Sequence, residues 1–308
     1  MNNLDKKKKA KRYTWDAKLF IFLCVSVPVV QWLIFYVYVH IDAFFLGFMN
    51  KNGEFTIDNF TRLFQEFTLE TSEIRLALRN TLLTFSITVI SYIPHVLVSY
   101  FLYKKIPGHK FYRIVFFLPS IIFSVAISMA FTRMLDTNGF VAQTVQKWMD
   151  LDYTPELLAD SRFANTVVLA EMVWLAFPGE LILWGGTFAR IPEDLLESAQ
   201  LDGVTWWQEF TKIIVPLVWP TVALQMILLS CGIFGASANV FLLTHGKFGT
   251  INLSTWMYLQ LLDNSGSNYT SNVYNYMSAV GMVMTVIAVS LSIVVRKITD
   301  KMNSEVDY

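Results

Sequence analysis

Six long apolar stretches with almost no charged residue recur along the chain. They are residues 19–41, 80–103, 114–132, 163–189, 213–246 and 264–295. A helix rises about 1.5 Å per residue, so roughly 20 apolar residues cross the ~30 Å hydrocarbon core of a bilayer. A soluble protein has no reason to repeat core helices of this length. The pattern therefore predicts an all-α integral membrane protein with six transmembrane helices.

The first apolar stretch follows a strongly basic segment. Residues 1–18 contain seven Lys and Arg residues, and a basic segment also precedes the apolar run of a signal peptide. Here the run is longer than that of a signal peptide and no small-x-small cleavage site follows, so we expect a retained membrane anchor. The expected division is a basic cytoplasmic tail (1–18), a first transmembrane helix with an extracellular loop (19–79), a five-helix core (80–296) and a second cytoplasmic tail (297–308).

The composition agrees with a membrane protein. The 308 residues are 54% hydrophobic and 16% charged, with a mean hydropathy of +0.45, whereas soluble domains have about 25% charged residues. This balance disfavours a disordered chain, a secreted disulfide scaffold and a nucleic-acid-binding protein. The two cysteines, Cys24 and Cys231, lie inside apolar stretches, which leaves no disulfide framework and no cysteine-based zinc site.

The zero net charge hides an asymmetry between the two sides of the membrane. Sixteen Lys and Arg residues lie in segments that alternate onto one side, namely 1–18, 104–113, 189–212 and 296–308. Only 8 lie in the opposite segments, 40–79, 133–162 and 244–272. Because Lys and Arg concentrate in cytoplasmic loops, both termini are predicted to be cytoplasmic.

Prolines and aromatic residues also mark the predicted spans. Pro28, Pro94, Pro119 and Pro178 lie inside four of them, where neighbouring helices can satisfy the backbone groups that proline frees. These prolines indicate helices that bend around a cavity, or simply the higher frequency of proline in membrane helices. Aromatic residues near the span ends are expected to be interfacial anchors: Trp15, Trp32, Tyr100, Tyr103, Trp219, Trp256, Tyr274 and Tyr276.

One predicted cytoplasmic loop breaks the charge rule. Residues 189–212 hold two basic and five acidic residues, so a role in fixing topology does not explain the loop. Pro192 is expected at the first position of a helix, because its fixed φ suits that position, and the acidic Glu193 and Asp194 favour the first turn. The apolar face of this helix is expected to consist of Leu195, Leu196 and Ala199.

The second half of this loop predicts a turn and another helix. Gly203 can take the left-handed conformation that ends a helix. Thr205 and Gln208 have the spacing of a capping box that opens the next one, whose apolar face continues through Phe210, Ile213 and Ile214 into the fifth span. The loop is therefore expected to be a helix–turn–helix at the membrane surface.

This loop resembles the "EAA" loop of bacterial binding-protein-dependent ABC importer permeases. That pattern reads Glu-Ala-Ala, three residues, Gly, nine residues, Ile, one residue, Leu-Pro. Both spacings match, with its positions at Glu197, Ala199, Gly203, Ile213 and Pro216. Ser198 and Val215 replace an alanine and the leucine with residues of similar size.

Further resemblance to carbohydrate permeases extends over roughly residues 15–300. It lies at residues 58–60, 78–82, 116–119 and 191–193, and at Trp174 and Pro178. After the fifth span, Thr244-His245-Gly246-Lys247 matches the family's Thr-x-Gly-Gly-Pro only in part. The resemblance is greatest to the maltose-transporter-like, type I subunits.

The resemblance implies a type I ABC importer permease that forms the path for a sugar or oligosaccharide and is not itself an enzyme. It also implies a multi-pass protein in the cell membrane (inner or plasma membrane) of a bacterium. It also implies a heterodimer with a second homologous permease, two ATP-binding subunits and an extracytoplasmic solute-binding protein. ATP and Mg²⁺ would bind the ATPase, and no cofactor would bind this chain. The loop 192–216 would dock on the ATPase through Glu193, Glu197, Ser198, Ala199, Asp202, Gly203, Ile213 and Pro216.

Two acidic residues lie within the fourth predicted span. A charge at that depth costs roughly 2.5 kcal/mol or more, so Glu171 and Glu180 are expected to face a cavity or a partner. Alternatively, the side chain of Glu180 extends to water at the cytoplasmic end. The separation of Glu171 and Glu180 places them on opposite helix faces. Trp174 and Trp184 are candidates for stacking on sugar rings or for packing, and Asn239 for a solute contact or helix packing. Glu171, Trp174 and Asn239 form the candidate substrate path.

Other functions remain as alternatives at this stage. The solute could be a non-sugar such as a polyol phosphate, or the chain could be a membrane-embedded enzyme using Glu171 or Glu180, or a passive channel lined by Glu171. The sequence contains no phosphate-binding loop, His-Glu-x-x-His motif or dinucleotide fingerprint, and its four histidines are scattered. Catalytic and metal sites are therefore not predicted, and the expected contacts are with partner subunits and membrane lipid, not nucleic acid.

Overall fold

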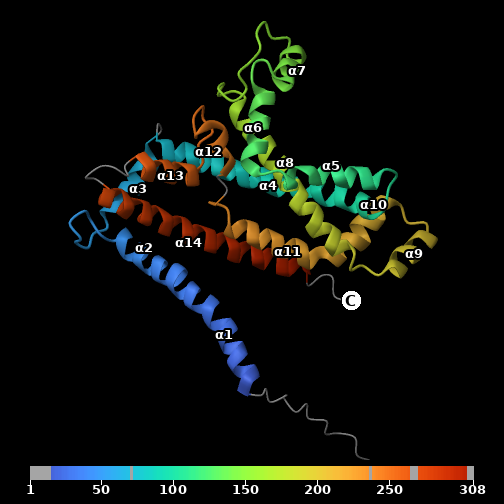
Figure 1. The fold of residues 1–308 in the computed structure, drawn as a ribbon, viewed down its shortest axis with the longest axis horizontal. Coiled ribbons are helices and arrows are strands. Elements are labelled where there is room, and N and C mark those ends of the chain that lie inside the picture. The colour runs from blue at the N-terminus through green and yellow to red at the C-terminus, as the bar shows by residue number, and fades with distance from the viewer. Residues whose placement is uncertain (1–14, 70–71, 236–237, 264–269, 304–308) are drawn as a thin grey trace, which may run out of the picture.

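A computed structural model describes residues 15–69, 72–235, 238–263 and 270–303, which form helices joined by turns (Figure 1). The first helical region comprises α1 (Trp15–Trp32), η1 (Leu33–Tyr38) and α2 (Val39–Gly47). It is followed by α3 (Asp58–Thr68), α4 (Glu73–Tyr103), α5 (His109–Ile121), α6 (Ser124–Leu135), α7 (Phe140–Trp148) and α8 (Ala164–Phe188). The remaining elements are α9 (Glu193–Leu201), α10 (Trp206–Glu209), η2 (Phe210–Ile214), α11 (Val215–Cys231), α12 (Ala238–Thr244), α13 (Leu253–Asp263) and α14 (Thr270–Asn303).

The long apolar stretches become long helices. Among the described residues, five helices are long and apolar enough to cross a membrane, or six if one bent pair counts as a span. Pro28, Pro94, Pro119 and Pro178 lie inside α1, α4, α5 and α8, as expected. Most of the basic tail (residues 1–14) and the start of the last apolar stretch (residues 264–269) lie outside the described residues.

The third apolar stretch was wrongly predicted as one helix. It forms α5 and α6, whose axes differ by 105°. Ile122 and Phe123 have extended backbone between them, with ψ of 138° and 130°, and extended residues cannot continue the hydrogen-bond ladder of a helix. Apolar periodicity does not report backbone angles, so this break was not visible in the residue pattern.

The fifth apolar stretch also divides, which corrects the position predicted for Asn239. Helix α11 ends at Cys231, a turn through Gly232 and Gly235 follows, and α12 begins at Ala238. Asn239 therefore lies at the start of a separate short helix and not within the fifth span. Glycine in such a run disfavours helix, since it loses more backbone entropy than other residues do.

The long helices pack in pairs. Helix α4 packs against α8, and α11 and α2 both pack against α14. One buried cluster includes Leu63, Ile74 and Leu253 near α3 and α13, and another includes Tyr100, Trp184 and Phe188 near α10. In Figure 1, α3 and α13 lie at one end of the bundle and α9 and α10 at the other, and we call these the α3 end and the loop end.

The first helix leaves the bundle. Helix α2 packs on α14, whereas α1 points away from the other helices (Figure 1). No residue in the most apolar window of the Ala17–Gly47 helix is buried by this chain. Removing apolar surface from water is favourable, so this helix requires lipid or another subunit around it.

Three of the predicted interfacial anchors are instead core residues. Tyr100 is fully buried, and Trp256 and Tyr276 are 4% and 3% exposed. Tyr276 donates to Glu66 Oε2 and lies under the guanidinium of Arg62. Trp15, in contrast, is largely exposed at the start of α1. Proximity to the end of a span therefore did not distinguish aromatic residues of the core from aromatic residues at the interface.

Candidate functional site

The acidic loop forms the predicted helix–turn–helix. Helix α9 spans Glu193–Leu201, with Glu193 and Asp194 in its first turn. Pro192 is the N-cap, one position earlier than predicted, because its backbone is extended. Leu196 and Ala199 are buried, as expected for the apolar face, but Leu195 is 44% exposed. The buried face of α9 is therefore narrower than the three-residue apolar face predicted from the sequence.

Gly203 ends α9 in the predicted left-handed conformation, with φ of 74°. The amide of Val204 donates to the carbonyl of Ala199, and that of Gly203 to the carbonyl of Gln200, which is the Schellman pattern. Thr205 and Gln208 then form the predicted capping box at the start of α10. Both ends of the turn are thus fixed by local hydrogen bonds.

The loop continues without a break into the fifth span. Helix α10 passes into η2, where Phe210 and Ile214 are buried, and Pro216 lies in the first turn of α11. Ile213 is half-buried. Glu193, Glu197 and Ser198 of α9 are exposed, as are Asp202 and Gly203 in the turn that follows it. Motif residues thus divide into an exposed face and a buried face that joins the bundle.

A buried carboxylate ties this loop to α4. Glu209 in α10 is 3% exposed. Its Oε1 accepts hydrogen bonds from Tyr100 Oη at 3.0 Å and from Lys104 Nζ at 2.9 Å, and Lys104 Nζ also lies 3.0 Å from Oε2. We call these three residues the Glu209 clamp. Sequence reasoning missed its pairing, because Tyr100 and Lys104 lie more than 100 positions away.

A second polar site lies within the bundle. A cavity of about 310 Å³ lies between α4, α8, α12 and the segment before α13. Its polar lining consists of uncharged side chains able to donate and accept hydrogen bonds: Thr84, Asn165, Asn239, Thr250 and Asn252. Of these five residues, only Asn239 was predicted as a solute contact. The others are single polar residues in or near apolar stretches, and that isolation is the sequence signal that could have identified them.

Glu171 is fully buried, and Met172, the next residue along α8, lines this cavity. Oε1 of Glu171 accepts a hydrogen bond from Ser128 Oγ of α6 at 2.7 Å. The side chain of Asn239 lies near this carboxylate, but Oε2 has no hydrogen-bond partner among the residues that the structure describes. The structure therefore brings Glu171 and Asn239 together and leaves one buried oxygen unsatisfied.

The other membrane candidates lie elsewhere. Trp174 is 43% exposed and stacks on Phe131 at 6.0 Å, outside the lining of the cavity. Trp184 is 1% exposed, which makes it a packing residue, and its Nε1 donates to Glu180 Oε2 at 3.0 Å. Glu180 and Glu171 have different neighbours, in agreement with their predicted placement on opposite faces of α8.

Asn80, in the segment 78–82, has a structural role in positioning the cavity wall. Its amide donates to the carbonyls of Gly249 and Ile251 at 2.7 and 2.8 Å. Thr81 Oγ1 accepts from the amide of Leu253. These bonds attach the segment between α12 and α13 to α4, and that segment supplies Thr250 and Asn252 to the cavity.

Comparison with known proteins gives the family of this fold. Residues 74–304 match the family described as "Binding-protein-dependent transport system inner membrane component". This chain belongs to that family. The match includes α9, α10 and every helix that lines the cavity, so both candidate sites are in the part shared with the family.

Individual relatives are more distant. The chain is 24% identical over 318 residues to the diacetylchitobiose uptake system permease protein NgcF of Streptomyces coelicolor, covering 94% of this chain and 86% of that protein. It is 27% identical over 190 residues to the probable ABC transporter permease protein YurN of Bacillus subtilis, covering 61% of this chain. That match spans only 63% of YurN.

The fold matches a solved transporter. A chain in the crystal structure of a bacterial alginate ABC transporter, in complex with an alginate pentasaccharide-bound periplasmic protein, has a TM-score of 0.77 to this chain. The match covers 93% of this chain and 96% of the other at 20% identity. This similarity confirms the type I importer permease fold. The family match and the long apolar helices together show a multi-pass membrane protein.

Proposed function

We propose that this chain is the permease subunit of an ATP-driven importer of a sugar or oligosaccharide. The observation that carries the proposal is the exposed acidic face of α9, held on a helical loop that is joined rigidly to the bundle. A loop kept only for topology needs neither two capped helices nor a buried ion pair. The family assignment and the sugar permeases among the relatives support this function.

Transmission of movement follows from the contacts of this loop. A force on α9 passes through the turn at Gly203 to α10, and from there by the Glu209 clamp to α4 and through η2 to α11. Helix α4 carries Thr84 in the cavity wall and packs against α8, which carries Asn165. Docking of an ATPase on α9 would therefore move the walls of the cavity.

The chemistry of the cavity suits an uncharged, hydroxyl-rich solute. Asparagine and threonine side chains offer both donors and acceptors to sugar hydroxyls. Glu171 does not itself line the cavity, but its carboxylate lies near Asn239, which does. We propose Glu171 and Asn239 as solute contacts and assign Trp174 to the outer surface of the path.

The proposal includes partner subunits. An energy source must lie elsewhere, on two ATP-binding subunits with ATP and Mg²⁺, and an external binding protein would deliver the solute. The exposed apolar surface of α1 fits a second permease or lipid. The loop end would face the cytoplasm, together with both termini, as the distribution of Lys and Arg indicates.

Two matched charge reversals test this function. Glu197→Lys changes the exposed face of α9, and Glu156→Lys changes an exposed residue at the other end of the fourth apolar stretch. Each full-length variant is expressed with its transport partners, and we measure co-purified ATPase and solute-stimulated ATP hydrolysis in proteoliposomes. We expect loss of both for Glu197→Lys only. Normal coupling in Glu197→Lys, or equal loss in both variants, would contradict the proposal.

A further inference from the structure

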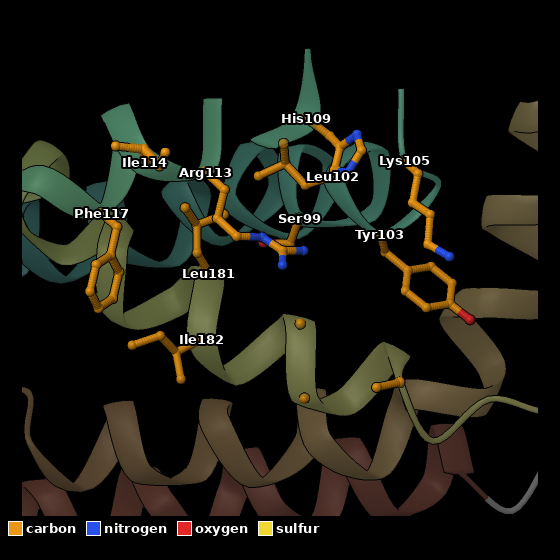
Figure 2. Close-up of a pocket in the computed structure, with 13 residues that line it drawn as sticks. Ser99, Leu102, Tyr103, Lys105, His109, Arg113, Ile114, Phe117, Leu181 and Ile182 are labelled. Atoms are coloured by element: carbon orange, nitrogen blue, oxygen red, sulfur yellow. The ribbon is translucent and has the colours of Figure 1, made fainter. Parts of the chain in front are cut away.

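A large pocket lies at the loop end, apart from the cavity described above. It measures about 680 Å³ and lies between the C-terminal end of α4, the N-terminal half of α5 and the C-terminal half of α8. Figure 2 shows the side chains of Arg113 and Phe117 reaching from α5 toward α8. None of the residues proposed above for solute contact or docking lines this pocket.

The charged side chains that line this pocket are all basic. Lys105, His109 and Arg113 contribute to its lining, and no acidic residue does. Neither Lys105 nor Arg113 forms an ion pair with another described residue. Lys104, one position earlier, is by contrast neutralised by Glu209. The pocket therefore presents uncompensated positive charge beside a membrane span.

The turn between α4 and α5 places these cations. Lys105 has a left-handed backbone with φ of 56°, and Gly108 reverses the chain with φ of 81°. This turn starts α5 directly over the end of α4, so His109 and Arg113 fall on one face of α5 a turn apart. Figure 2 shows Lys105 at one side of the pocket, next to Tyr103, and Arg113 near Ser99.

The rest of the pocket is apolar and open. Phe117 of α5 and Ile182 of α8 line the side of the pocket away from Lys105, and Ile114 lies next to Arg113 (Figure 2). Gly185 and Gly186 of α8 also line it, and a Cβ added at either would meet no atom within 4 Å. A cationic mouth followed by an apolar wall matches a molecule with an anionic head and a hydrocarbon tail.

We propose that this pocket binds one anionic phospholipid, with its phosphate between Lys105 and Arg113 and an acyl chain against Phe117 and Ile182. Basic pockets between membrane helices bind anionic headgroups because each nearby cation adds electrostatic attraction. The phosphate could in principle come from solution, but a free ion would leave the apolar part of the pocket uncovered. The site is independent of the solute carried, so it does not rest on the proposed function.

Native mass spectrometry of the full chain in a neutral detergent tests the site. The probes are phosphatidylglycerol and phosphatidylcholine with identical acyl chains. We expect preferential retention of phosphatidylglycerol by the unmodified chain. The double variant Lys105→Asn with Arg113→Gln should weaken that binding about thirtyfold and leave phosphatidylcholine unchanged. Asparagine is chosen at position 105 because it tolerates a left-handed backbone.

Matched variants separate the pocket from general effects. Lys110→Gln removes an exposed charge on α5 outside the pocket and should leave lipid binding unchanged. Gly186→Leu fills the pocket and should weaken phosphatidylglycerol binding with all cations present. Gly179→Leu, at an open position of α8 outside the pocket, should not.

Three results would overturn the proposal. The first is equal retention of the two lipids, and the second is an equal loss for Lys110→Gln and the double variant. The third is displacement of phosphatidylglycerol by millimolar inorganic phosphate together with no effect of Gly186→Leu, which would assign the cations to a free anion.

Discussion

Two buried carboxylates, Glu209 and Glu171, lie in very different surroundings. Glu209 accepts hydrogen bonds on both oxygens and pairs with Lys104. Glu171 has one bond, from Ser128, and an unsatisfied Oε2. Buried charges that are fully paired hold a structure in place, whereas an unsatisfied buried group costs stability and persists where function requires it. The first is thus a clamp and the second a candidate binding group.

Removing the clamp should have the largest effect. Glu209→Ala leaves Lys104, whose side chain is 25% exposed, without its partner and Tyr100 without an acceptor. We expect a loss of about 2 to 3 kcal/mol of stability. Thermal unfolding of the purified chain in detergent measures this loss, with Glu197→Ala on the exposed face of α9 as the control. Equal stability of the two variants would mean that Glu209 does not fix the loop.

The turn between α9 and α10 should be next in sensitivity. Gly203→Val places a β-branched residue at φ of 74°, which costs about 1 to 2 kcal/mol and should loosen α9 against α10. Thermal unfolding and solute-stimulated ATP hydrolysis are measured together. Gly179→Ala, within α8 at an open position, is the control and should be neutral or stabilising. A Gly203→Val protein with unchanged coupling would show that the turn need not be rigid.

Glu171 should behave in the opposite way to Glu209. Glu171→Gln keeps the shape of the side chain and removes a charge that lacks a full set of partners, so stability should change by less than about 1 kcal/mol. Solute affinity should fall, because Oε2 is lost as an acceptor. Thermal unfolding and the concentration dependence of uptake separate the two effects. A large loss of stability without a change in affinity would make Glu171 a structural residue.

A third carboxylate, the half-buried Asp160, extends the comparison to the segment before α8 and should show the smallest effect. Hydrogen bonds from Arg162 lower the pKa of Asp160 below its ordinary value. A lowered pKa stabilises the fold above the unfolded pKa of about 3.9, and this contribution disappears as the pH falls through the folded pKa. Arg162→Gln should bring the pKa of Asp160 back toward its ordinary value, as NMR titration would show. An unchanged pKa would contradict the role of Arg162.

Sequence alone predicted the elements governed by local chemistry. The acidic first turn of α9, the left-handed Gly203 and the capping box at Thr205 all follow from contacts between residues a few positions apart. The long helices follow from the length of the apolar stretches. The same pattern failed at Ile122 and after Cys231, because apolar residues suit a straight span and a broken one equally well.

The pairings of polar groups depended on distant parts of the chain. Glu209 was one of five acidic residues in its loop, and only the packing of α10 on α4 distinguished it from the exposed Glu197. Asn80 and Glu171 could likewise be recognised in the sequence as polar residues near or inside apolar stretches, but their hydrogen-bond partners could not. Their roles required the positions of α6, α12 and the segment before α13.

The residue pattern was enough to predict a membrane transport component with a structured loop at one end. Capping motifs act over a few residues, and hydrophobic length acts along one helix, so both can be recognised from neighbouring positions. Helix packing, in contrast, established which carboxylates are paired, which remain unsatisfied, and where Lys105 and Arg113 border an apolar pocket. Those outcomes depend on burial and on partners that folding brings together, and neither is encoded in the spacing of neighbouring residues.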